Sequence, residues 1–376
     1  MPSHDCIVLG VGGVGAAALY HLARRGVRAV GLDRFQPGHD RGSSHGETRI
    51  IRQAYFEHPD YVPLLLRAYE LWRELEAERG EQLYHEVGLL QAGPPDGTVV
   101  PGVLESARRH SLEVEELSCE AAMRRFQGFR IPGGMKAVFE RRAGYLRVEE
   151  CVRAHAEEAV RLGAELRAGE AVEGWRHDRG GFEVRTKSGV FRAPSLIVTA
   201  GAWAPLLLQD LGVRFEVRRK PVFWHRAATR DYLVGPCFLF ETSDGVFYGF
   251  PEIEGSGLKA AKHSGGDIVT DPLTVDRSER PSDLADVQSF LTKHLPGVSR
   301  ERLRHSVCLY TMTLDEHFVL DRHPAHPRLV FAAGLSGHGF KFTCVLGEAL
   351  AQLAIDGRTP HPIGFLGLGR PGLRAP

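Results

Sequence analysis

Hydrophobic and polar positions near the N-terminus predict a strand, a helix and a second strand in close succession. Residues 6–9 form a short apolar run typical of a buried parallel strand, and the glycine-rich residues 10–15 follow it directly. Residues 16–25 have apolar side chains at helical spacing, and residues 27–32 form a second apolar run. This order of elements is typical of a βαβ unit, the repeating piece of a parallel sheet.

Further along the chain, the pattern does not continue as a simple βαβ series. Helices are expected at residues 60–78, 149–162 and 345–354. Buried strands that run into small residues are expected at 195–203 and 329–334, and a loop-rich section with a turn cluster at 93–97 follows the first helix. These strands come from the start, middle and end of the chain, and each ends in small residues that could contact one bound nucleotide. They therefore imply a discontinuous nucleotide-binding domain, and the stretches between them would build a second domain.

Composition and charge narrow the classes of partner. The chain has 376 residues, 43% hydrophobic and 25% charged, so one large or two closely joined globular domains are expected. Lysine plus arginine and aspartate plus glutamate both total 47, which gives no reason to expect nucleic acid or an anionic membrane as a partner. No apolar stretch approaches the ~20 residues that span a bilayer and no leader segment is evident, so we expect a cytoplasmic protein. The six scattered cysteines are expected to be free thiols, and no metal site is predicted.

The glycine-rich stretch has the form G-x-G-x-x-G, and its surroundings fit a dinucleotide. Gly10 allows the tight turn, Gly12 lets the backbone approach a pyrophosphate, and Gly15 lets helix and strand pack closely. The free N–H groups of the following helix favour phosphate groups. Asp33 ends the second strand and can accept a hydrogen bond from a ribose hydroxyl, which argues against a 2′-phosphate. We therefore predict dinucleotide binding, although the motif alone does not separate NAD from FAD.

Three later segments and one cysteine offer groups suited to chemistry. Residues 42–52 bring two arginines, a histidine and small hydroxyl residues beside the predicted phosphate site, where arginines can hold a carboxylate or a cofactor anion. One of the two lysines at residues 257–263, Lys259 or Lys262, could stand beside a flavin ring, and the glycine-rich loop at 336–342 suits close approach to a cofactor ring with Lys341 as a fixed cation. Each segment also has a structural alternative, namely a solvated loop, a surface face or a plain turn. Cys308, between apolar neighbours, is by itself more typical of an inert core thiol than of a reactive one.

Taken together and in this order, four motifs resemble the monomeric sarcosine oxidase family, which includes N-methyl-L-tryptophan oxidase and pipecolate oxidase. The motifs are GSSHGETRIIR at 42–52, YGFP at 248–251 with GLK at 257–259 and His263, CLYT at 308–311, and SGHGFKF at 336–342. The resemblance covers essentially the whole chain. It implies an α/β fold (α+β overall), with a discontinuous Rossmann-like FAD-binding domain and a smaller substrate domain that has an antiparallel sheet. The expected ranges are 1–80, 145–215 and 305–376 for the FAD-binding domain, and 81–144 and 216–304 for the substrate domain.

The resemblance also implies roles for individual side chains. Cys308 matches the family cysteine that bonds covalently to the 8α carbon of FAD. Arg52 and Lys341 match the pair that holds the substrate carboxylate. Lys259 matches the lysine placed against the flavin to activate oxygen. The cofactor implied is therefore FAD, attached through Cys308.

Four further residues complete the expected catalytic set. Tyr248 and His263 match residues that line the substrate pocket, while His45 and Arg49 match groups beside the flavin. The expected cofactor-binding residues are Gly10, Gly12, Gly13, Val14, Gly15, Asp33, Ser43, Ser44, Thr48, Arg49, Val172, Ala200, Gly201, Trp203, Cys308, Gly337, His338, Gly339 and Lys341.

The implied activity is that of an FAD-dependent oxidase of small secondary amino acids, either N-methylated or cyclic. A hydride passes from the carbon next to nitrogen to the flavin, water hydrolyses the imine, and O2 accepts the electrons to give H2O2. An N-methyl substrate then gives formaldehyde. We expect a monomer whose partners are the amino acid and O2. Two other functions stay open at this point: a flavin-binding protein without oxidase turnover, and an NAD-dependent dehydrogenase. The sequence does not choose among sarcosine, larger N-methyl amino acids, pipecolate and proline.

Overall fold

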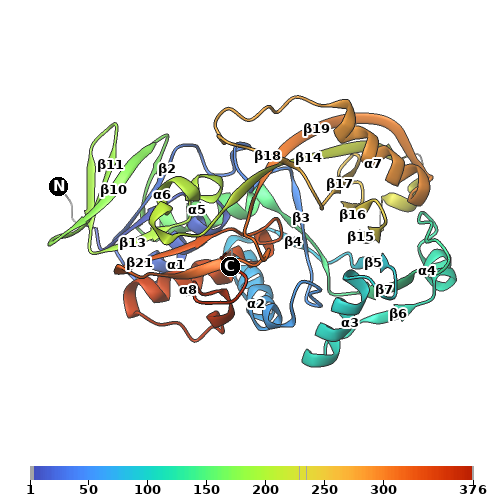
Figure 1. The fold of residues 1–376 in the computed structure, drawn as a ribbon, viewed down its shortest axis with the longest axis horizontal. Coiled ribbons are helices and arrows are strands. Elements are labelled where there is room, and N and C mark those ends of the chain that lie inside the picture. The colour runs from blue at the N-terminus through green and yellow to red at the C-terminus, as the bar shows by residue number, and fades with distance from the viewer. Residues whose placement is uncertain (1–3, 228, 234, 375–376) are drawn as a thin grey trace.

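The computed structural model describes residues 4–227, 229–233 and 235–374, and one of its two large sheets is mostly parallel. This sheet has the order β20–β21–β13–β1–β2–β9. Its strands are β1 (Cys6–Leu9), β2 (Ala29–Asp33), β9 (Glu165–Ala168), β13 (Ser195–Val198), β20 (Val319–His323) and β21 (His326–Ala333). Neighbouring strands are parallel except for β20 and β21. Segments from the start, middle and end of the chain therefore share one sheet, as Figure 1 shows on its left side.

Alternate side chains of β1 pack into two hydrophobic clusters, one on each face of the parallel sheet. Cys6 and Val8 pack into a cluster with four helices. These are α1 (Gly13–Arg24), α2 (Val62–Arg79), α5 (Val148–Arg161) and α8 (Thr343–Asp356). Ile7 and Leu9 face the other side, toward a small antiparallel sheet of β10 (Val172–Asp178), β11 (Gly181–Thr186) and β12 (Val190–Ala193). Because β1 is buried on both faces, its sequence reads as a continuous apolar run.

The second large sheet is built around two long antiparallel strands, β14 and β19. Its order is β18–β14–β17–β16–β15–β5–β7–β6. β19 is not part of this path and pairs with β14. The bounds are β5 (Leu89–Gly93), β6 (Glu115–Leu117), β7 (Lys136–Glu140), β14 (Glu216–Ala227), β15 (Cys237–Thr242), β16 (Gly245–Phe250), β17 (Leu258–Lys262), β18 (Asp267–Ile268) and β19 (Val298–Met312). The associated helices are α3 (Val99–His110), α4 (Cys119–Arg125) and α7 (Pro281–His294).

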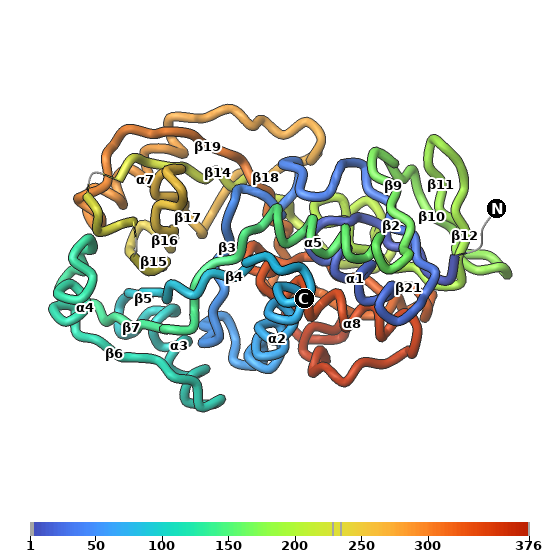
Figure 2. The backbone as a smooth tube through the Cα atoms, turned by 180° about the vertical axis from the view of Figure 1, so that it is seen from behind, coloured from blue at the N-terminus to red at the C-terminus, as the bar shows by residue number. Residues whose placement is uncertain are grey.

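A small ladder lies between the two large sheets in Figure 2. It pairs β3 (Thr48–Ile51) with β8 (Gly144–Arg147), and β8 with β4 (Tyr84–His85). The remaining short helices are α6 (Ala204–Leu207) and 3-10 turns at Pro59–Tyr61, Gly201–Trp203, Gln209–Leu211, Arg230–Tyr232, Phe340–Phe342 and Gly364–Leu366. The ladder matters for function because β3 belongs to the 42–52 motif.

Most of the predicted elements are confirmed, with shifts at their ends. The βαβ unit is β1, α1 and β2, and the helices expected at 149–162 and 345–354 are α5 and α8. The prediction of a loop-rich section after residue 78 is wrong, since α3, α4 and β4 to β8 lie there. β5 has five buried residues in a row, so no alternation marks it as a strand. The expected domain boundaries stay a prediction; β19 runs across the last of them.

No helix in the described residues has the length and apolar character needed to cross a bilayer. Residues 1–3, at the start of the segment in which no leader was evident, lie outside the described residues, as do residues 375–376.

Two buried histidines in the helical layer make stability depend on pH. Burial lowers the pKa of His21 in α1 to about 4 and that of His155 in α5 to about 3, against ~6.5 in an unfolded chain. Below pH ~6.5 the unfolded chain therefore binds protons that the folded protein does not, and stability falls as the pH falls.

We expect His155→Gln to reduce the loss of stability between pH 7 and pH 5 by about 2 kcal/mol. The free energy of unfolding from urea titrations at both pH values measures this difference. The exposed His177 is the control, and His177→Gln should keep the pH dependence of the unchanged protein. Equal pH dependence in all three proteins would contradict the assignment.

Candidate active site

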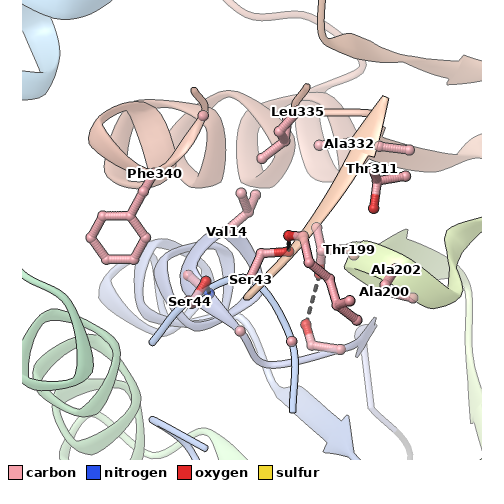
Figure 3. A pocket seen from close by; sticks show the side chains of 18 of the residues that line it. Val14, Ser43, Ser44, Thr199, Ala200, Ala202, Thr311, Ala332, Leu335 and Phe340 are labelled. Atoms are coloured by element: carbon pink, nitrogen blue, oxygen red, sulfur yellow. Dashed lines mark hydrogen bonds between the residues drawn. The ribbon is translucent and has the colours of Figure 1, made fainter. Parts of the chain in front are cut away.

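A cavity of about 590 Å³ joins the carboxyl end of the parallel sheet to the face of the second sheet. Figure 3 shows Val14 of α1, Ser43 and Ser44 before β3, Ala200 after β13 and Ala332 of β21 around this space. The carboxyl edge of a parallel sheet is where ligands bind in open α/β folds. The cavity thus begins at the predicted dinucleotide site and continues toward the second sheet.

The β1–α1 turn has the geometry that its glycines require. Gly10 has φ +87°, and a Cβ there would stand 2.7 Å from the carbonyl oxygen of Thr199. A Cβ on Gly15 would stand 1.8 Å from the carbonyl oxygen of Gly10, so any larger residue would push α1 off the strand. A Cβ on Gly12 would meet nothing closer than Ser44 Oγ at 4.0 Å. The turn is therefore closed toward the protein and open toward the cavity.

The polar groups at this end of the cavity fit the phosphates and ribose of a dinucleotide. α1 begins without a side-chain cap at Gly12 and has no acidic residue in its first turn, which leaves N–H groups and the positive dipole end for an anion. Asp33, at the end of β2, accepts hydrogen bonds from the N–H of Val11 (2.6 Å) and of Phe35 (2.8 Å). These contacts hold the carboxylate at the cavity wall.

Cys308 on β19 lies beside two basic side chains. Arg49 Nη2 is 3.1 Å from Cys308 Sγ, and His45 Nδ1 is 3.9 Å from it. Burial acts to raise the pKa of this thiol, but the charges of His45, Arg49 and Lys259 outweigh burial and lower it to about 6. Burial raises the pKa of Cys237, by contrast, well above its usual range. Cys308 is therefore a thiolate near neutral pH and is suited to act as a nucleophile.

Two buried cations, Arg52 and Lys341, stand near one ring at the other end of the cavity. The guanidinium carbon of Arg52 is 4.1 Å from the ring centroid of Tyr55, and Lys341 Nζ is 5.1 Å from the same centroid. Burial and Arg52 lower the pKa of Lys341 to about 7. Glu57, which the sequence analysis missed, accepts hydrogen bonds from Arg52 Nη2 on both carboxylate oxygens at 2.7 Å. Burial opposes ionisation of Glu57, but Arg52 and the neighbouring basic groups lower its pKa to about 2.

Two tyrosines and a histidine complete the wall near the cations. Tyr248, His263 and Tyr310 all line the cavity, and Tyr310 Oη lies 3.3 Å from His263 Nδ1. Burial, and then the charge of Lys220, lower the pKa of His263 to about 3, so this imidazole is neutral. Tyr310 was missed as a site residue even though it stands inside the quoted CLYT motif.

Lys259 stands behind the cavity wall, on β17. Its Nζ donates to the carbonyl oxygens of Gly46 (2.5 Å) and Thr48 (2.9 Å). Burial and Arg49 lower the pKa of Lys259 to about 7. The carbonyls of the turn at residues 46–48 therefore hold this cation, which is not itself among the residues that line the cavity.

Comparison with known proteins identifies the fold and the cofactor class. Residues 5–353 match the family model described as FAD dependent oxidoreductase. The chain belongs to this family of FAD-dependent oxidoreductases.

Relatives within the FAD-dependent oxidoreductases resemble the chain over its full length. A monomeric sarcosine oxidase from Streptomyces avermitilis is 42% identical, with 97% of each chain covered. An N-methyl-L-tryptophan oxidase from Yersinia pestis is 38% identical, covering 98% of this chain and 99% of its own. Among solved structures, NikD, an unusual amino acid oxidase essential for nikkomycin biosynthesis, matches with a TM-score of 0.87 and 27% identity, over 98% of both chains. The resemblance inferred from the four motifs is confirmed.

The cavity fits the FAD that this family uses. Three buried polar atoms on its lining residues have no hydrogen-bond partner within the described protein, namely Trp203 Nε1, Thr311 Oγ1 and Thr343 Oγ1. Buried polar groups are rarely left unpaired, so these atoms indicate a polar ligand. Because the chain belongs to a family of FAD-dependent enzymes, the family match favours FAD over the alternative of an NAD-dependent dehydrogenase.

The cavity brings most of the predicted site residues together. Those that line it are Gly10, Gly12, Gly13, Val14, Asp33, Ser43, Ser44, Arg49, Arg52, Val172, Ala200, Gly201, Trp203, Tyr248, His263, Gly337, His338, Gly339 and Lys341. The lining does not include Gly15, His45, Thr48, Lys259 or Cys308. Two of these residues lie next to Arg49 or its neighbours: Cys308 is beside Arg49 and His45, and Lys259 donates to the carbonyl of Thr48. The functional roles of both groups stay predictions.

Proposed function

We propose that this protein is an FAD-dependent oxidase of secondary amino acids, with sarcosine or another N-methyl or cyclic amino acid as substrate. The observation that carries the proposal is the pair of buried cations, Arg52 and Lys341, beside Tyr55 on a cavity that also reaches the dinucleotide turn. Relatives named for sarcosine and N-methyl-L-tryptophan support the same substrate class.

The cations orient the substrate by its carboxylate. A guanidinium and an ammonium can bind one carboxylate from two directions, which fixes the carbon next to nitrogen in the cavity. Glu57 shares Arg52 with the incoming carboxylate, so it limits how much positive charge the empty cavity presents. The substrate amine must be neutral to lose a hydride, and burial next to Arg52 and Lys341 lowers an amine pKa. Neutral His263 is then free to accept a hydrogen bond from that amine.

FAD, when bound, accepts the hydride and passes the electrons to O2. The chain supplies the positive charge that this second reaction needs. Lys259 is a buried cation and Arg49 a half-buried one, and such fixed charges stabilise negative charge that develops on oxygen during its reduction. Hydrolysis of the imine product needs only water.

We infer that Cys308 attaches the cofactor through a thioether. Support comes from the lowered pKa of its thiol and from its place behind the cavity-lining Arg49. The bond would join the Cys308 sulfur to the 8α methyl carbon of FAD. The thiol and the methyl group would each lose one hydrogen, and O2 would accept both as H2O2.

We expect Arg52→Met to lower kcat/KM for sarcosine about a hundredfold, or ~2.7 kcal/mol. The substrate carboxylate loses a bidentate partner and faces Glu57 without its counterion. Steady-state peroxide production measures the change. Lys293→Met is the control, because Lys293 pairs with Asp244 on the surface, and it should keep normal kinetics. An unchanged kcat/KM in Arg52→Met would contradict the proposed carboxylate site.

Peroxide production with sarcosine, N-methyltryptophan, pipecolate and proline tests the function as a whole. Production with any of these amino acids separates an oxidase from a flavin-binding protein without turnover. No peroxide from a preparation that contains FAD would contradict the proposal.

We also infer that the protein is a cytoplasmic monomer. The name of the sarcosine oxidase relatives and the six free cysteines support this. Light scattering in solution tests the oligomeric state.

A further inference from the structure

The turn that holds Lys259 has an unusual backbone. Gly46 has φ +88° and Glu47 has φ +68°, so a glutamate occupies the left-handed region that side chains seldom adopt. This conformation directs the carbonyls on either side of Glu47, those of Gly46 and Thr48, to the same Lys259 Nζ. Strained residues of this kind persist only where their surroundings hold them, and they gather at functional sites.

Glu149, in the first turn of α5, holds the backbone of this turn. Its Oε1 accepts from the N–H of Gly46 at 2.6 Å, and its Oε2 accepts from the N–H of Glu47 at 3.0 Å. The N–H of Val148 donates to the carbonyl of Glu47 at 2.8 Å. One carboxylate therefore fixes two consecutive left-handed residues.

The side chain of Glu47 acts on the same lysine through Trp224. Its Oε2 accepts from Trp224 Nε1 at 2.8 Å, and its Oε1 pairs with Arg304. Trp224 is the neighbour of Lys259 in the β14–β17 ladder, and Lys259 Nζ lies 5.3 Å from its ring centroid. The indole thus lies between the carboxylate of Glu47 and the ammonium, which it contacts through its ring.

The two glutamates also balance the charges around Lys259. Burial and Arg49 on β3 act against its charged form, while Cys308 on β19, Glu149 and Glu47 favour that form. Arg304, also on β19, is paired with Glu47. Once its sulfur is a thioether, Cys308 carries no charge. Of the groups that shift the pKa of Lys259, Glu47 and Glu149 are then the remaining anions.

We propose that Glu47 and Glu149 are positioning residues for Lys259, which hold the Gly46–Thr48 turn around its ammonium and keep that ammonium charged for the reaction with O2. The proposal rests on the role given to Lys259 in the proposed function. It assigns the two carboxylates to the oxidative half of the reaction alone, because neither lines the cavity where substrate binds.

The test uses the holoenzyme and the variants Glu47→Gln and Glu149→Gln. Flavin is reduced with dithionite and mixed with O2, so that no amino acid substrate is involved. A shift of one unit in the pKa of Lys259 would lower the rate constant with O2 about tenfold at pH 8 and less than about twofold at pH 6. The pH titration of the visible spectrum of the oxidised enzyme gives a second readout without turnover, whose midpoint should move to lower pH in both variants. Anaerobic reduction by sarcosine should stay within about twofold of normal.

The control is Glu150→Gln, the next residue on α5, which pairs with Arg153 on the surface. It should behave as the unchanged enzyme. In a Lys259→Met background, Glu47→Gln and Glu149→Gln should have no further effect. If either variant fails to hold flavin, the other carries the test.

Three results would overturn the proposal: an unchanged pH profile in both variants, an equal loss of rate at every pH, or a full effect in the Lys259→Met background. If Lys259→Met itself reacts normally with O2, the assigned role of Lys259 is wrong. If Lys259→Met is slow but both glutamate variants are normal, only the positioning role is wrong.

Discussion

Cys308→Ser is expected to leave none of the flavin attached to the protein after acid precipitation, whereas the unchanged protein should precipitate yellow. The serine hydroxyl has nearly the size of the thiol but is not ionised near neutral pH, so it cannot form the bond. Arg49 and His45 stay in place beside it. Absorbance of the washed precipitate and of its supernatant measures the attached and released fractions.

The matched control for this change is Cys344→Ser. Cys344 is also buried, but burial raises the pKa of its thiol well above the usual range. Its variant should stay yellow after precipitation. Colour that persists in Cys308→Ser, or is lost in Cys344→Ser, would show that the flavin is attached elsewhere or only trapped.

Lys259→Met should slow the reaction of the reduced enzyme with O2 by about 100- to 1,000-fold, because a preorganised charge in a buried site contributes on this scale. Methionine keeps an unbranched side chain against Trp224 and Phe250 but removes the charge. Anaerobic reduction by the amino acid should change little, since Lys259 Nζ is hydrogen-bonded to the Gly46 carbonyl and Lys259 does not line the cavity. Stopped-flow absorbance separates the two half-reactions.

Lys262→Met is the control for this variant, because Lys262 lies on the same strand but pairs with Asp286 at the surface. Both of its half-reactions should be normal. The reverse pattern in Lys259→Met, with slow reduction and normal reaction with O2, would place this lysine in substrate binding instead.

The dinucleotide end of the site could be predicted from sequence because its requirements are local. Gly10 must adopt a positive φ, and Gly15 must pack against the carbonyl of Gly10, so the residue types themselves record the geometry. Arg49 and Arg52 are indicated by the 42–52 motif instead, and they line the same cavity as the glycines although β3 belongs to another sheet.

The rest of the site depends on contacts that no local pattern records. Glu57 meets Arg52 because the segment after β3 turns back, and the carboxylate of Glu140 on β7 fixes that turn by accepting from the N–H of Gln53 and Ala54. A distant strand thus determines which side chain faces Arg52. The two carbonyl contacts of Lys259 likewise depend on the left-handed conformation of Glu47, a residue whose type does not indicate it.

If Cys308 holds the cofactor as proposed, the course of β19 would give the cofactor a second role. This strand belongs to the second large sheet, while the β1–α1 turn belongs to the parallel sheet. Gly10 lines the cavity, and Cys308 lies behind Arg49, which lines the same cavity. FAD attached to Cys308, as proposed, would therefore bridge the two halves of the molecule, with a covalent bond to β19 and noncovalent contacts at the β1–α1 turn. A freely bound cofactor stabilises a protein only in proportion to the logarithm of its concentration. A tethered one keeps a constant effective concentration. Dilution and dialysis would then leave the stability of this enzyme unchanged.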